Sequence, residues 1–160
     1  MHTTIAHHDG LYLLKGNSEH LNAIYHNYKI DFPPNERKNY RILKSLIENE
    51  QYKLLLLKHS QMDSILGYAL IYDLSTLDAL WLDYIAINPN YRGRGYGTYF
   101  FQHLLGEFSP QINGIFLEVE IPNQIDLSNY QQQKKRIQFY EKLGAKKLNL
   151  NYLFPSSEGA

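Results

Sequence analysis

Cysteine is absent from this chain of 160 residues. Disulfide bonds and thiolate nucleophiles are therefore excluded from its chemistry. An excess of charge of one sign is absent as well, because 16 Lys and Arg residues balance 16 Asp and Glu residues. A formally neutral chain gives no overall reason to expect a nucleic acid or an anionic membrane surface as a partner.

Long apolar runs are also missing. No stretch approaches the roughly 20 residues of a membrane-spanning helix, and residues 1–10 lack the apolar centre of a signal peptide. We therefore expect a cytoplasmic protein with no membrane association. Seven histidines occur, but none forms a pair at helical spacing beside a carboxylate, so no metal site is expected.

Alternating strand and helix patterns predict an α/β chain. Its length suits one domain, which we place at residues 1–155, with residues 156–160 as a disordered tail. The expected strands cover residues 11–15, 52–58, 65–72, 80–88, 114–121 and 148–154. The expected helices begin with Ser18 as cap, at about Asn35 and after the glycines at 93–97, and a fourth helix ends at Gly144. Residues 123–133 are polar and poorly patterned, which favours a loop before that fourth helix.

The most informative segment, residues 84–98, reads Tyr-Ile-Ala-Ile-Asn-Pro-Asn-Tyr-Arg-Gly-Arg-Gly-Tyr-Gly-Thr. An apolar strand stops at Pro89, a glycine-rich turn follows, and an amphipathic helix begins. The three glycines allow consecutive N–H groups to curl around a phosphate. The first donors of the helix and its positive dipole end face the same point, and Arg92 and Arg94 add charge. The segment predicts a diphosphate site, although a loop that merely starts a helix is the alternative.

Two motifs resemble those of the GCN5-related N-acetyltransferase (GNAT) family. Residues 85–97 are similar to the family's acetyl-CoA motif, and Phe139-Tyr-Glu-Lys-Leu-Gly-Ala145 is similar to its second landmark, an aromatic-Tyr helix that ends in Gly-Phe. The resemblance implies an α/β (α+β) fold with a mixed, mostly antiparallel sheet of six to seven strands. It further implies a splay between strands 4 and 5 and about four flanking helices.

The resemblance also implies acetyl-CoA as co-substrate and no metal. The turn would hold the diphosphate through the backbone of Arg92, Gly93, Arg94, Gly95, Tyr96, Gly97 and Thr98. The preceding strand would pair with the pantetheine arm through Ile85, Ala86 and Ile87, and a bulge N–H would polarise the thioester carbonyl. Arg136 is placed to meet the 3′-phosphate. Many members carry an Asn seven residues before the catalytic Tyr; Gln133 stands there in this chain, residues 124–132 look like an insertion, and Asn123 is the substitute candidate.

Tyr140 stands where similar enzymes place the acid that protonates the leaving thiolate, although the same position on a helix stripe also suits a core aromatic. Glu118 is similar to the fifth-strand glutamate that serves as general base in ribosomal-protein N-terminal acetyltransferases. Glu120 ranks second and Glu36 third, while Asp83 lies close to the splay. A water relay without a single base is also open.

These residues predict an enzyme, an acetyl-CoA-dependent N-acetyltransferase. It would move acetyl to a primary amine of a small molecule or peptide N-terminus by direct attack, as a monomer or homodimer. A non-catalytic acyl-CoA sensor or interaction module on the same fold is the alternative. A dinucleotide-binding oxidoreductase is disfavoured, because the glycines read G-x-G-x-G and too little chain follows them to build a doubly wound sheet.

Overall fold

The computed structural model describes residues 8–125 and 127–153 of the chain. Their contacts divide them into two compact units, one ending at Phe116 and the other beginning at Leu117. Each unit is described by itself below. Within these residues, no helix combines the length and the apolar character that crossing a membrane requires.

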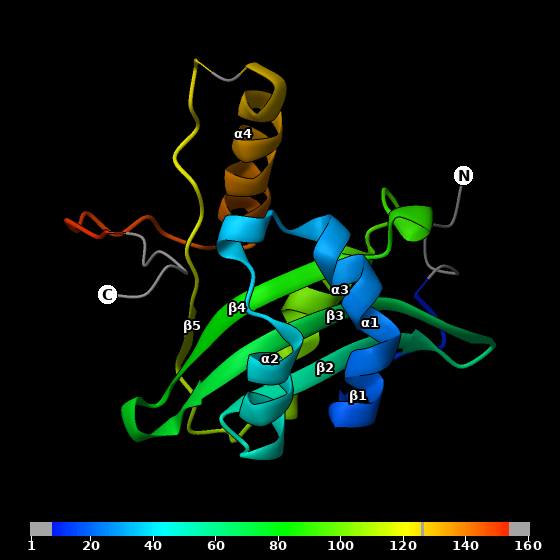
Figure 1. Ribbon diagram of the computed structural model, residues 1–160. Coiled ribbons are helices and arrows are strands. Elements are labelled where there is room, and N and C mark those ends of the chain that lie inside the picture. Colours follow the sequence, from blue (N-terminus) through cyan, green and yellow to red (C-terminus); the bar gives the residue numbers. More distant parts are fainter. Residues whose placement is uncertain (1–7, 126, 154–160) are drawn as a thin grey trace. The chain divides into compact units, whose positions relative to one another are not determined.

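The first unit is built on a five-stranded sheet in the order β1-β2-β3-β4-β5 (Figure 1). The strands are β1 (Leu11–Gly16), β2 (Tyr52–His59), β3 (Met62–Leu74), β4 (Ala79–Ile87) and β5 (Gly114–Phe116). The first three neighbouring pairs are antiparallel, and β4 pairs with β5 in parallel. The prediction of a mixed, mostly antiparallel sheet is confirmed, but the described sheet has five strands and not six or seven.

Two strand predictions were wrong for the same physical reason. The strand expected over residues 114–121 stops at Phe116, and residues 148–153 form no strand, while Phe154 lies outside the described residues. Leu148 and Leu150 carry the expected alternation, yet their side chains are 58% and 68% exposed. A strand needs a neighbour for its backbone hydrogen bonds, and alternation in the sequence does not supply one.

The four α-helices are α1 (Ser18–Asp31), α2 (Tyr40–Glu48), α3 (Tyr96–Leu104) and α4 (Leu127–Lys142). The cap of α1 is Asn17, whose side chain accepts hydrogen bonds from the N–H groups of Glu19 and His20, and not Ser18. The second helix begins five residues later than expected. Asn39 caps it by accepting from the N–H of Ile42, because the prolines before it hold the chain in a short 3₁₀ turn, Pro34–Glu36.

The fourth helix begins earlier than expected. The segment read as a loop, residues 123–133, is helical from Leu127 onward, so most of the supposed insertion is the start of α4. The sequence pattern did not predict this part of α4 because the helix is polar. None of its residues is fully buried, and its hydrophobic stripe is weak.

The core of the first unit lies between the sheet and α1 with α2, while α3 covers the opposite face (Figure 1). The buried cluster on the α1–α2 face consists of Leu21, Ile24, Tyr28, Leu43, Ile47, Tyr52, Leu54, Leu56, Tyr68, Leu70 and Tyr84. On the other face, α3 contacts β1 and β4 and buries Phe100 and Leu104 completely. Covering both faces fixes β4 and, with it, the turn that leads into α3.

Candidate active site

One edge of β4 carries little strand pairing. Its parallel pairing with β5 joins Ala79–Trp81 to Gly114–Phe116 and ends there. From Leu82 to Ile87, β4 pairs only with β3 among the described strands. This stretch contains Ile85, Ala86 and Ile87, the residues predicted to pair with a pantetheine arm.

The ladder between β3 and β4 contains a bulge. Leu70 pairs with Tyr84 and Ile71 pairs with Leu82, so Asp83 is the extra residue. A bulge bends a strand and leaves one residue out of the regular ladder. The structure therefore has the predicted irregularity in β4, two residues before Ile85.

The glycine turn has the backbone conformation that an anion site needs. Gly93 and Gly95 have φ angles of 76° and 80°, in the left-handed region that favours glycine. Gly95 caps α3 without any side-chain hydrogen bond. The N–H of Tyr99 is the first to bond within the helix, to the Gly95 carbonyl at 3.1 Å. Among the described residues, the N–H groups of positions 93–98 have no acceptor, so they remain available for an anion.

The two arginines of the turn have different roles. The guanidinium of Arg92 donates to Asp31 Oδ1 at 3.0 Å and, through Nε, to the Ile87 carbonyl at 2.9 Å. Its charge is thus directed into the protein. Arg94 is exposed and lies over the ring of Tyr91, with 5.7 Å between its guanidinium carbon and the ring centroid. Arg94 is therefore the arginine of the turn that can attract a phosphate from solution.

Lys38 and Asp83 form an ion pair beside the bulge. Lys38 Nζ lies 2.7 Å from Asp83 Oδ2, and the side chains are 29% and 12% exposed. The Tyr52 hydroxyl donates to the same carboxylate oxygen. Burial, followed by the charge of Asp83, raises the pKa of Tyr52, so this phenol stays protonated. Because the carboxylate of Asp83 already accepts from two donors, it is a poor candidate for the general base.

Tyr140, in the second unit, is fixed by the end of α4. Gly144 has a φ of 93°, its N–H bonds to the Glu141 carbonyl at 3.0 Å, and the Ala145 N–H bonds to the Tyr140 carbonyl at 3.0 Å. This is the Schellman arrangement, which confirms the predicted terminal glycine. Burial raises the pKa of Tyr140, and the charge of Arg136, one turn earlier on the exposed side of α4, lowers it less. The phenol is therefore neutral at physiological pH, as a proton donor must be.

The glutamates of the second unit differ in their surroundings. Glu118 has one carboxylate oxygen, Oε2, that is buried and has no hydrogen-bond partner among the described residues. Glu120 Oε2 instead accepts from Gln133 Nε2 at 2.7 Å. Gln133 thus already engages Glu120, whereas the described residues provide no donor to Glu118 Oε2, and Glu118 stays the first candidate for the base.

Gln133 stands where many family members carry the Asn before the catalytic Tyr, and both ends of its amide are engaged. Besides its bond to Glu120, its Oε1 accepts from the N–H of Asn123 at 3.0 Å. The side chain of Asn123 in turn accepts from the N–H of Ile125 at 3.0 Å. Gln133 thus ties α4 to the segment that follows β5, a role that its position in the sequence did not reveal.

Two further residues near the turn escaped sequence reasoning. Asp31 is 61 residues from Arg92 in the chain, and no local pattern pairs them. The ring of His8 lies against Gly95, where its Nε2 would be 3.2 Å from a Cβ built on that glycine. Contacts of this kind join remote segments, so only the fold could identify them.

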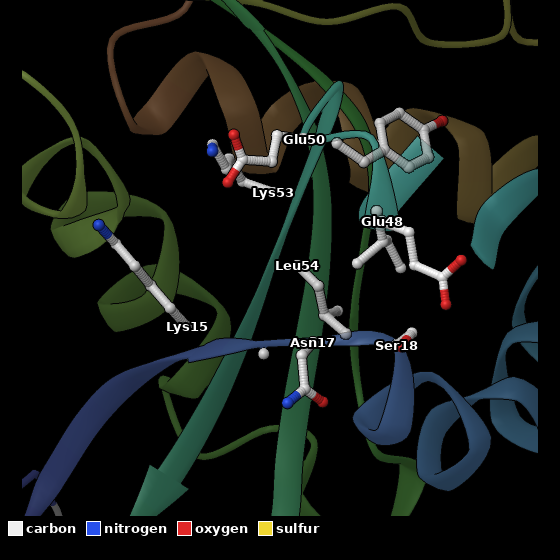
Figure 2. A pocket seen from close by; sticks show the side chains of 10 residues that line it. Lys15, Asn17, Ser18, Glu48, Glu50, Lys53 and Leu54 are labelled. Atoms are coloured by element: carbon white, nitrogen blue, oxygen red, sulfur yellow. The ribbon is translucent and has the colours of Figure 1, made fainter. Parts of the chain in front are cut away.

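A depression of 360 Å³ lies elsewhere on the first unit. Residues from the β1–α1 and α2–β2 junctions line it (Figure 2): Lys15, Gly16, Asn17, Ser18, Ile47, Glu48, Glu50, Tyr52, Lys53 and Leu54. The strand register aligns Gly16 and Leu54 with Leu70 and Tyr84, three residues along β4 from Ile87. None of the predicted site residues lines it. Among the described residues, no three His, Cys, Asp or Glu side chains form a group that could hold a metal ion.

A strand, a glycine turn whose N–H groups find no acceptor among the described residues, and a helix therefore follow one another at this point of the chain. A model of the acetyltransferase (GNAT) family matches residues 21–145. The chain therefore belongs to the GNAT acetyltransferase family. No curated protein matches the sequence.

Solved structures share this fold. A GNAT-family protein from Bacteroides thetaiotaomicron superposes with a TM-score of 0.75 and 22% identity, over 93% of this chain and 80% of the other. The ribosomal-protein-S18-alanine N-acetyltransferase of Escherichia coli gives a TM-score of 0.65 and 23% identity, over 93% and 86%. An aminoglycoside acetyltransferase from an uncultured soil metagenomic sample, in complex with sisomicin, gives 0.63 and 10%, over 91% and 96%. At these identities the likeness establishes the fold.

The left-handed conformation of the turn gives a prediction about its glycines. Gly93→Ala should lower the free energy of unfolding by about 1 kcal/mol, because an L-residue is strained at positive φ. No atom lies within 4 Å of the Cβ that alanine adds, so crowding does not contribute. Gly106→Ala is the matched control, because Gly106 also has open space but no positive φ. Urea denaturation of both variants measures the difference, and equal effects would show that the turn does not need the left-handed conformation.

Proposed function

We propose that the protein is an N-acetyltransferase that moves acetyl from acetyl-CoA to a primary amine by direct attack. The observation that carries this proposal is the run of N–H groups at positions 93–98 that have no acceptor among the described residues, where β4 ends and α3 begins. Membership of the acetyltransferase family supports the same reading. We further propose that the two compact units belong to one domain, since the family match spans both.

The proposed contacts of a CoA ester come from the glycine turn and β4 of the first unit, with Asn123 and Arg136 added from the second. The diphosphate would take the N–H groups of the turn, with Arg94 adding charge, and Arg136 is the proposed partner of the 3′-phosphate. The pantetheine arm would pair with β4 along Ile85–Ile87 as an added strand. The bulge at Asp83 would turn a backbone N–H toward the thioester carbonyl, where it stabilises the oxyanion that forms during attack. Asn123, which is exposed, remains a candidate contact for the CoA ester.

The reaction balances without a covalent enzyme intermediate. The neutral amine attacks the thioester carbonyl, a C–N bond forms, and the C–S bond breaks to release CoA thiolate. Tyr140 donates its phenolic proton to that thiolate and recovers one from solvent. A free phenol has a pKa of about 10 and a thiol one of about 8.5, and burial raises the pKa of Tyr140 further, so the transfer is uphill and the placement of the phenol matters more than its acidity. The proton lost by the amine passes to Glu118.

The acceptor is a primary amine whose further identity stays open between two classes. Among the structural neighbours, one acts on an alanine of a ribosomal protein and another is bound to an aminoglycoside. A peptide N-terminus and a small amine are both compatible with attack at the same thioester. The protein would act as a monomer or homodimer. The alternative function is an acyl-CoA sensor on the same fold, which would bind acetyl-CoA but support no turnover.

Acetyl-CoA should stabilise the protein against heat. At a hundredfold excess over its dissociation constant, the ligand adds about 2.7 kcal/mol, which raises the melting temperature of a chain of this size by about 5–10 °C. A thermal-shift titration with acetyl-CoA, CoA and NAD measures this effect. A rise with both CoA compounds but not NAD is expected, and no rise with either CoA compound at millimolar concentration would remove the basis of the proposal.

Tyr140→Phe should lower kcat by roughly 10²–10⁴-fold and leave the KM for acetyl-CoA unchanged, because only proton donation is removed. Burial raises the pKa of Tyr140. An acid must be protonated to act, so its contribution is lost only as pH rises through that raised pKa, and wild-type kcat should show no alkaline fall from this group below about pH 10.

Tyr130→Phe, on the same helix, is the matched control and should retain activity. Unchanged turnover in Tyr140→Phe would assign the acid to another group. Binding of acetyl-CoA without turnover of any amine by the wild type would favour the sensor.

Glu118→Gln should lower kcat/KM for the amine most strongly at pH values below the pKa of the acceptor, where the amine is an ammonium that must lose a proton. The activity should recover toward wild type as pH rises, because the neutral amine then no longer needs a base. A pH profile of kcat/KM measures this. Glu120→Gln is the control, since that carboxylate is already engaged by Gln133, and matching profiles for both variants would contradict the assignment.

A further inference from the structure

A buried carboxylate lies behind the glycine turn. Asp31 is the last residue of α1, and its side chain is only 5% exposed. Its two oxygens have different donors: Oδ1 accepts from Arg92 Nη2 at 3.0 Å, and Oδ2 accepts from the Tyr68 hydroxyl at 2.7 Å. Arg92 also donates through Nε to the Ile87 carbonyl at 2.9 Å. One network therefore connects α1, β3, the end of β4 and the start of the turn.

Tyr96 is buried and the His8 ring lies against Gly95, so the helix end of the turn is packed, while its first residues have less around them. Gly93 has no atom within 4 Å of a built Cβ, and the helix cap at Gly95 has no side-chain hydrogen bond. Glycines at positive φ also have more conformational freedom than other residues. Arg92 immediately precedes these glycines, and its guanidinium is held by a charge-assisted bond to a carboxylate that solvent barely reaches. The anchoring of Arg92 therefore helps to set the direction in which the N–H groups of the turn point.

We propose that Asp31 is a positioning residue for the glycine turn. Through Arg92, Asp31 holds the N–H groups of positions 93–98 in the arrangement that receives the diphosphate, and Arg92 serves this anchor and not the phosphate itself. The inference rests on the proposed function for the identity of the ligand, whereas the anchoring of the turn is a property of the free protein. A site organised before binding loses less free energy in ordering its donors.

A direct contact of Arg92 with phosphate is the competing role, and it predicts the opposite change in acetyl-CoA affinity for Asp31→Asn. If Arg92 bound phosphate directly, Asp31→Asn would free its guanidinium and leave acetyl-CoA binding equal or tighter. If Asp31 positions the turn, Asp31→Asn and Arg92→Gln should each weaken acetyl-CoA binding about tenfold, and the double variant should lose no more than either alone. Calorimetric titration with acetyl-CoA gives these affinities. Glu48→Gln removes the exposed Lys44–Glu48 pair and is the matched control, with unchanged affinity expected.

A second measurement separates failure of this inference from failure of the proposed function. Hydrogen exchange of the peptide covering residues 88–98 should quicken in Asp31→Asn and Arg92→Gln without ligand, while peptides from β2 keep wild-type rates. Arg92 is 51% exposed, so Arg92→Gln reports even where Asp31→Asn does not fold. If the wild type does not bind acetyl-CoA but exchange is faster in the variants, only the identity of the ligand, and with it the proposed function, would be overturned. Unchanged exchange, or tighter binding by Asp31→Asn, would overturn the positioning role.

Discussion

The pairing of β4 along only one edge beyond Trp81 is the constraint on which the rest of the first unit depends. The strand must bury Leu80, Leu82 and Tyr84 in the core, yet beyond Trp81 its second edge has no strand partner among the described residues. Its parallel neighbour β5 can be reached only by a crossover, which α3 provides. The crossover places the glycine turn and the first free N–H groups of α3 directly at the end of the half-paired strand. The unpaired edge of β4 and the candidate anion site therefore both follow from the α3 crossover between β4 and β5.

The charges and hydroxyls of this unit mostly serve to connect its elements. The two least exposed carboxylates in its ion pairs, Asp31 and Asp83, each accept from one cation and one tyrosine hydroxyl. The Tyr84 hydroxyl donates to the Glu36 carbonyl, and the Tyr28 hydroxyl accepts from the N–H of Lys38. Buried tyrosines are stable when their hydroxyls find partners. These bonds give a structural reason for several of the 14 tyrosines in the chain.

The arrangement leaves the anion site to backbone groups. With the charge of Arg92 paired to Asp31, the turn presents N–H donors and the exposed Arg94. Backbone donors hold their direction without the entropic cost of ordering long side chains. In the second unit, the Schellman turn fixes the end of α4 that carries Tyr140, and Gln133 joins α4 to the segment that contains Glu120. Both units thus secure their candidate residues by combining backbone turns with side-chain bonds, Asp31 to Arg92 in the first and Gln133 to Glu120 in the second.

The sequence by itself determined the features that depend on local chemistry. Glycines at 93, 95 and 144 specified left-handed turns, the prolines at 33 and 34 separated two helices, and two motifs specified the family. Only the tertiary structure decided features that join remote segments. It set the five-strand count, the early start of α4, the anchoring of Arg92 by Asp31 and the pairing of Lys38 with Asp83. Strand edges and ion pairs depend on neighbours that the fold supplies. Asp31 is 61 residues from Arg92, so the local sequence around Arg92 cannot indicate their pairing.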